Sequence, residues 1–136
     1  MQARTVMTAR TTPVSTLRLW AGRIISALVV AFMLFDGGIK VLQLAPATDA
    51  SAQLGYSASQ TLGVGLLALA CLAVYLLPRT AILGAVLLTG YLGGAVATQV
   101  RVDAPIFSVV FPVIVGALAW GGLFLRDARL RALLPL

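Results

Sequence analysis

The chain has 136 residues, of which 60% are hydrophobic and 10% charged, and its mean hydropathy is +1.02. A soluble domain carries about a quarter charged residues, so this composition excludes a compact soluble protein and favours an integral membrane protein. The formal net charge of +6 does not indicate nucleic-acid binding, because the basic residues flank apolar segments, where they act as topology determinants and contact anionic lipids.

The first 18 residues are polar and rich in Thr and Arg, and we expect a basic cytoplasmic tail without regular structure. The apolar run that follows predicts a helix over residues 19–44. Basic residues before an apolar run, with Ala45-Pro46-Ala47 after it, also fit a cleaved signal peptide. Asp36 and Lys40 would then lie between the apolar region and the cut, which argues for an uncleaved membrane helix.

The rest of the chain contains three long intervals without a charged side chain. They lie between Asp49 and Arg79, between Arg79 and Arg101, and between Asp103 and Arg126. Each interval holds the roughly 20 apolar residues that a helix needs to cross a bilayer. The intervals predict helices over residues 59–77, 80–100 and 105–125, followed by a basic cytoplasmic segment, residues 126–136.

The predicted fold is therefore all-α: an integral membrane four-helix bundle with antiparallel, up-down topology. Arginines precede the first helix, occupy the middle turn at Arg79 and follow the last helix. Because basic residues concentrate on the cytoplasmic side of membrane proteins, we expect both termini in the cytoplasm.

Asp36 and Lys40 are the charged pair inside the first span. Their i, i+4 spacing places both on one helical face. An ionisable group in a membrane span is costly and is a functional candidate. One hypothesis is a polar pocket in the outer leaflet that binds a small anion, a quinone headgroup or a proton. The other is an ion pair that only fixes helix register. The candidate residues are Asp36, Lys40, Gln99, Arg101, Thr98 and Gln60.

Glycines in the third span form a second pattern. Gly90 and Gly94 recur four residues apart, with Gly93 beside them, as in small-xxx-small motifs that let membrane helices approach closely. We expect this row to pack helices within one chain, the alternative being dimerisation.

Several kinds of chemistry are excluded by composition. Cys71 is the only cysteine and there is no histidine, so one chain has neither a disulfide nor the thiol and imidazole ligands of common zinc and haem sites. We therefore expect no covalently bound cofactor, no metal site and no catalytic constellation, and an enzyme acting alone is the least favoured class.

Four segments form an ordered set of motifs over about the last hundred residues of the chain. They are GGIK at 37–40, QLGY at 53–56, LTGYLGGAVATQVRV at 88–102, and WGGLFLRD at 120–127 followed by Arg129-Leu130-Arg131. Together they resemble the DoxX-like family, and the ordered set is more specific than any one motif. In one departure, Gln99 stands where many relatives have His, so a titrating or metal-binding role is not transferred to that position.

The resemblance implies a four-helix protein of the bacterial cytoplasmic membrane whose activity is not established. Some relatives are subunits of sulfur-oxidising quinone reductases or associate with oxidative-stress enzymes. We therefore expect a non-catalytic membrane subunit with a redox partner protein in the bilayer and quinone as the candidate ligand. The alternatives are a small proton-coupled transporter that uses Asp36 and a purely structural membrane module; the oligomeric state stays open.

Overall fold

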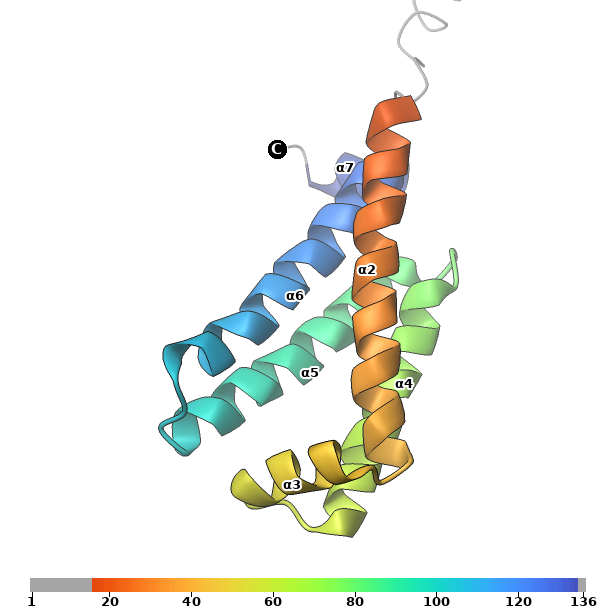
Figure 1. Cartoon of the computed structure of the whole chain (residues 1–136). Helices are drawn as coiled ribbons and strands as arrows, with labels where there is room; N and C mark the ends of the chain where they lie inside the picture. Colours follow the sequence, from red (N-terminus) through yellow and green to blue (C-terminus); the bar gives the residue numbers. More distant parts are fainter. Residues whose placement is uncertain (1–15, 135–136) are drawn as a thin grey trace, which may run out of the picture.

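The computed structural model describes residues 16–134, which form a helical bundle without strands (Figure 1). Four of its helices are long and apolar enough to cross a membrane: α2, α4, α5 and α6. These confirm the predicted all-α, four-helix membrane fold. The helices are α2 (Thr16–Val41), α3 (Ala45–Gln53), α4 (Ala58–Leu76), α5 (Ala81–Arg101), α6 (Ile106–Arg126) and α7 (Ala128–Leu133).

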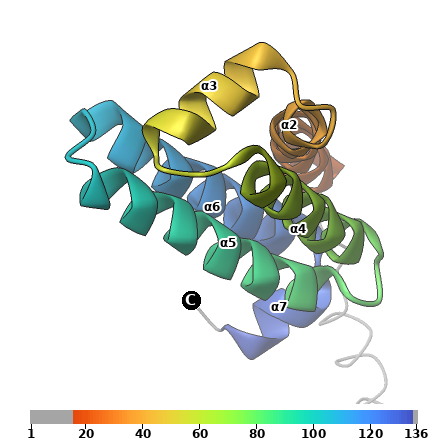
Figure 2. The ribbon, with the colours of Figure 1, turned by 90° about the horizontal axis from the view of Figure 1, so that it is seen from below.

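The four long helices form a ring. α2 packs against α4 and α6, and α5 packs against the same two helices. At one end, here called the closed end, lie the start of α2, the α4–α5 turn and the α6–α7 junction (Figure 1). At the other, the open end, α5 and α6 diverge from α2 and α4, and α3 lies across the bundle (Figures 1 and 2).

Glycines bring the helix backbones together at the closed end. A Cβ added to Gly22 would lie 2.8 Å from the carbonyl oxygen of Gly122, so α2 and α6 are in backbone contact. A Cβ added to Gly84 would lie 2.2 Å from the backbone of Tyr75, so α4 and α5 are equally close. These positions make the small-residue contacts that associate membrane helices.

The row of Gly90, Gly93 and Gly94 makes no close helix–helix contact within the described residues of one chain. A Cβ added to any of the three would meet no other atom of the described residues within 4 Å. The reason is the divergence of α5 from α2 and α4: the row lies on the part of α5 that has left the tight contact. The four-residue spacing of the glycines indicates a surface that permits close approach, but the close contact between α4 and α5 forms at Gly84, nearer the α4–α5 turn.

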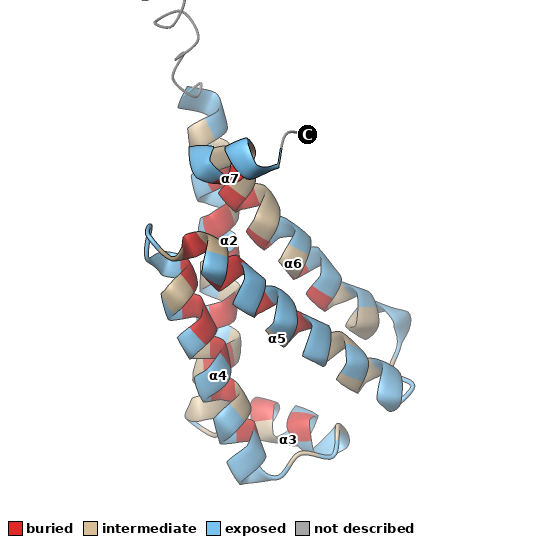
Figure 3. Ribbon diagram, turned by 180° about the vertical axis from the view of Figure 1, so that it is seen from behind, coloured by how far each residue is buried: buried red, intermediate tan, exposed pale blue. Residues whose placement is uncertain are grey.

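Buried residues face the bundle axis, and the outward faces are exposed (Figure 3). Met33 and Leu123 are completely buried, whereas Leu28 and Val113 on the outer faces are 63% and 57% exposed. Cys71 is buried in the core, as a packing residue would be. An apolar exterior of this kind is solvated by lipid, so the chain is a multi-pass membrane protein.

The first span is displaced from its predicted bounds by three residues at each end. α2 already includes residues 16–18, and the rest of the predicted tail lies outside the described residues. The helix ends at Val41 because Gln43 adopts a left-handed conformation, with φ of 56°. Pro46 then lies in the first turn of α3, where proline is well tolerated.

Candidate functional site

Three polar side chains meet between α2 and α5. Lys40 Nζ lies 2.7 Å from Asp36 Oδ2 and donates a 3.0 Å hydrogen bond to the hydroxyl of Tyr91. The Tyr91 hydroxyl in turn donates to Asp36 Oδ2 at 3.2 Å. The result is a closed triangle of an acid, a base and a phenol, here called the polar triad.

The local sequence explains how the triad forms. The i, i+4 spacing of Asp36 and Lys40 brings their side chains together on one face of α2. Gly65 of α4 makes room for Lys40, because a Cβ added there would lie 2.7 Å from Lys40 Cβ. The Asp36 and Lys40 side chains are 25% and 19% exposed, so the pair is largely but not fully enclosed.

The triad lies on the wall of a cavity of about 500 Å³, within the size range of small-molecule sites. Residues of α2, α3, α4, α5 and α6 line it, so the cavity occupies the space between the diverging helices. Part of its wall is aromatic: Phe32 and Phe111 pack edge to face at 5.0 Å, and Phe107 lies 5.6 Å from Phe111.

A second polar contact lies on the cavity wall, between the segment after α3 and the end of α5. The Tyr56 hydroxyl is 3.1 Å from Thr98 Oγ1, which also donates to the Gly94 carbonyl at 2.8 Å. Gln99 lines the cavity beside them. Polar groups therefore occur at two places on a mostly apolar wall, an arrangement that orients an amphipathic ligand.

Two predicted pocket residues act elsewhere. The Arg101 guanidinium donates to the Leu54 carbonyl, tying α5 to the segment after α3, and forms no ion pair with Asp36. Gln60 closes a capping box with Ser57: its side chain accepts from the Ser57 backbone N–H at 2.9 Å, and its own N–H donates to Ser57 Oγ at 3.3 Å. Both side chains therefore bond to backbone groups of the open end, outside the triad.

Sequence reasoning considered Tyr91 as a residue of the same pocket but favoured a structural role for it, and it missed the aromatic wall. The available signal for Tyr91 was a phenol at mid-span, which needs a hydrogen-bond partner in an apolar environment. Phe32, Phe107 and Phe111 gave no such signal, because phenylalanine is equally expected on a lipid-facing surface.

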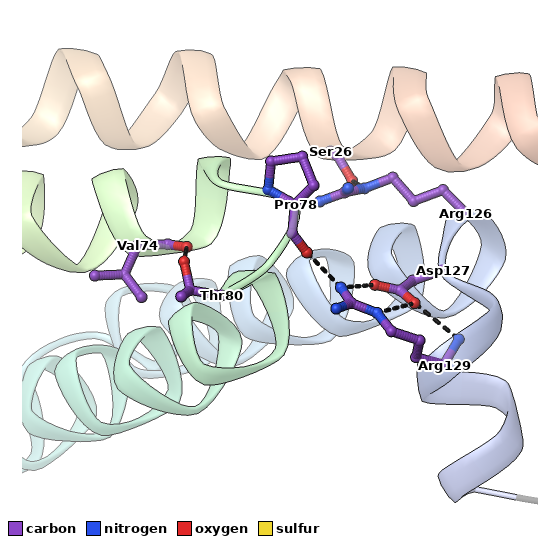
Figure 4. A network of polar contacts seen from close by, with 7 residues as sticks. All are labelled: Ser26, Val74, Pro78, Thr80, Arg126, Asp127 and Arg129. Atoms are coloured by element: carbon purple, nitrogen blue, oxygen red, sulfur yellow. Dashed lines mark hydrogen bonds and ion pairs between the residues drawn. The ribbon is translucent and has the colours of Figure 1, made fainter.

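A separate polar chain at the closed end was also missed; Figure 4 shows two of its side chains, Ser26 and Arg126. Arg126 Nε donates to Ser26 Oγ at 2.9 Å, and Ser26 Oγ lies 3.3 Å from the Tyr75 hydroxyl. Tyr75, only 1% exposed, donates to the Ala119 carbonyl at 2.9 Å. The Arg126 guanidinium carbon lies 5.4 Å from the centre of the Tyr75 ring. This chain joins α2, α4 and α6 at a place well separated from the cavity.

The charged groups beyond the spans form a local clamp. Arg129 pairs with Asp127 at 3.0 Å, donates a backbone hydrogen bond to it at 2.8 Å, and also bonds to the Pro78 carbonyl (Figure 4). The hydrogen bonds from Arg129 lower the pKa of the Asp127 carboxyl below its usual value. No cluster of three or more His, Cys, Asp or Glu side chains that could hold a metal ion occurs in residues 16–134.

Comparison with known families agrees with this architecture. Comparisons with curated proteins and with solved structures gave no match. A family model described as the DoxX-like family matches residues 24–122, a region that extends from the first span to the last and includes the triad. The chain therefore belongs to the DoxX-like family of membrane proteins.

Proposed function

We propose that the protein is a non-catalytic membrane subunit that binds the headgroup of a lipophilic molecule, a quinone above all, in the cavity beside the polar triad. The observation that carries this proposal is the position of Lys40 and Tyr91, two hydrogen-bond donors on the wall of a largely apolar cavity of about 500 Å³. A quinone has a flat apolar ring with carbonyl acceptors at its edge, which matches this combination.

Each part of the site has a separate task in this proposal. The Lys40 ammonium donates to one quinone carbonyl while it stays paired with Asp36, and the Tyr91 hydroxyl, which has a single proton, turns from Asp36 to the same carbonyl. Phe107 and Phe111 contact the ring, because aromatic groups pack favourably at offset or edge-to-face geometry. The isoprenoid tail extends into lipid. In this proposal a partner protein transfers the electrons, and the cavity binds the quinone and exchanges it with that partner.

We propose a location in the bacterial cytoplasmic membrane, and the distribution of arginines supports an orientation with the closed end in the cytoplasm. Arg79, Arg126 and Arg129 all gather at that end. By the same rule the cavity lies on the outer side of the bilayer.

A proton-coupled transporter receives less support. On α2, the inward-facing residues between Ser26 and Asp36 are Val29 and Met33, which are 2% and 0% exposed. They form an apolar layer between the cavity and the polar chain at the closed end. Transport would require this layer to open, whereas headgroup binding requires no such change.

The test is a binding titration: decylubiquinone is added to the purified protein in lipid nanodiscs, and binding is measured as quenching of tryptophan fluorescence. Replacing Tyr91 by Phe removes one donor and should weaken binding about five- to tenfold. The control is Tyr75→Phe, which removes a phenol outside the cavity and should leave binding unchanged. Absence of saturable quenching in the wild-type protein, or equal weakening by both variants, would refute the proposal.

A further inference from the structure

A basic depression lies at the closed end, outside the cavity described above. It has a volume of about 390 Å³ and is formed by the α4–α5 turn and the α6–α7 junction, segments about 50 residues apart in the chain. Three arginines and one aspartate line it: Arg79, Arg126, Arg129 and Asp127. Figure 4 shows the last three of these in place.

The charges of the depression are only partly balanced. Arg129 forms an ion pair with Asp127 and also donates to the Pro78 carbonyl, so the Arg129–Asp127 pair is neutral as a unit. Arg126 is fixed by Ser26 and the Tyr75 ring, but its two terminal nitrogens have no hydrogen-bond partner among the described residues. Arg79 is exposed, and within residues 16–134 it bonds to no carboxylate or carbonyl. Two positive charges therefore remain available for an anion.

The surroundings of the depression favour a lipid over a free anion. Arg79 follows directly on the last residues of a membrane-spanning helix, so the depression lies where lipid headgroups are found. Leu76 and Leu77, beside it in the chain, are 52% and 58% exposed. An anionic lipid presents a phosphate next to acyl chains and can use both features, whereas a soluble anion makes no use of the leucines.

We propose that this depression binds the phosphate group of an anionic membrane lipid. Arg126, already oriented by Ser26 and Tyr75, provides the fixed part of the contact. Arg79 completes it with a guanidinium fork, which matches the geometry of phosphate oxygens. The acyl chains lie against Leu76 and Leu77. The bound lipid would then join the α4–α5 turn to the α6–α7 junction, adding to the Arg129–Pro78 hydrogen bond.

The experiment is a measurement of lipid binding to the detergent-purified full chain by native mass spectrometry. Dioleoyl phosphatidylglycerol is titrated against dioleoyl phosphatidylcholine, a zwitterionic lipid with no net charge, as the comparison. The wild-type protein should bind phosphatidylglycerol preferentially. Arg79→Gln should weaken that binding about tenfold, as expected for the loss of one charge-assisted contact to phosphate.

The matched control is Arg23→Gln, which removes one positive charge from the same end of the bundle but from outside the depression. It should leave the binding of phosphatidylglycerol unchanged. Equal weakening by both variants would mean a diffuse charge effect and would overturn the proposal, as would the absence of any effect of Arg79→Gln.

Inorganic phosphate distinguishes the two sources of the anion. If phosphate at millimolar concentration displaces phosphatidylglycerol, the site serves a soluble anion and the lipid assignment is wrong. If Arg79→Gln fails to give a monodisperse protein, the wild-type preference for phosphatidylglycerol and its resistance to phosphate decide the question. Neither readout depends on quinone binding.

Discussion

Replacing Lys40 by Met should destabilise the protein more than removing both charges of the Asp36–Lys40 pair. In the wild-type structure Asp36 Oδ2 receives hydrogen bonds from Lys40 at 2.7 Å and from Tyr91 at 3.2 Å. Lys40→Met removes the shorter bond and the only opposite charge within ion-pair distance among residues 16–134. Because Asp36 lies in a membrane-spanning helix and its side chain is 25% exposed, bulk water only partly replaces the lost partner.

The expected magnitude follows from this geometry. Breaking a fully buried ion pair from one side costs about 3–5 kcal/mol. The partial exposure of Asp36 and its remaining hydrogen bond to Tyr91 lower this to about 2–3 kcal/mol. In the double variant Asp36→Asn, Lys40→Met no unpaired charge is left. The two substitutions should therefore be non-additive by about 1–2 kcal/mol.

The two single variants and the double variant are unfolded reversibly in mixed micelles by titration with sodium dodecyl sulfate. Circular dichroism monitors the loss of helix. The control cycle combines Asp36→Asn with Arg101→Met. Arg101 lies at the same end of the bundle but bonds to the Leu54 carbonyl, so its effect should add to that of Asp36→Asn. Additivity within about 0.5 kcal/mol in the Lys40 cycle would refute the reasoning.

Two further predictions concern the closed end and the glycine row. Gly84→Ala should lower the free energy of unfolding by more than about 3 kcal/mol in the same titration, because the new methyl group would lie 2.2 Å from the backbone of Tyr75. Gly93→Ala, whose methyl group meets no atom within 4 Å, should stabilise α5 by up to about 1 kcal/mol. Equal destabilisation by the two variants would contradict this reasoning. The Asp127 pKa is lower in the folded than in the unfolded protein, so the Asp127–Arg129 pair stabilises the fold at neutral pH and its contribution is lost as pH falls through the lowered folded pKa. Melting temperatures measured from about pH 6 to about pH 3 should therefore fall less steeply in Asp127→Asn than in the wild-type protein, and identical slopes would contradict the assignment.

The helices and the Asp36–Lys40 pair could be predicted from the sequence because both depend on local spacing. Charge-free intervals of sufficient length identify the spans, and an i, i+4 acid and base meet on any α-helix. The end of α2 was less predictable, because Gln43 is not a residue that demands a left-handed conformation.

Contacts between distant segments could not be predicted in this way. Tyr91 reaches Asp36 only because α5, opposite α2 in the ring, places it at the same depth in the bundle, which the sequence of neither helix specifies. Arg126 and Ser26 are 100 residues apart, and nothing local links them. The row of Gly90, Gly93 and Gly94 gives a further example. Small residues permit a close approach of two helices, but the arrangement of the helices decides where that approach occurs.

The backbone contacts at Gly22, Gly84 and Gly122 have a mechanical consequence. They join α2 to α6 and α4 to α5 by backbone contact at the closed end, whereas side-chain hydrogen bonds, such as Tyr91–Asp36 and Arg101–Leu54, link α5 to the other side of the bundle farther along. α5 has 21 residues and is therefore about 30 Å long, so a rotation of about 5° about its contact at the closed end displaces its far tip by about 2–3 Å. Small angular adjustments at the backbone contacts thus translate into large changes in the width available to a guest molecule, while the helices themselves stay intact.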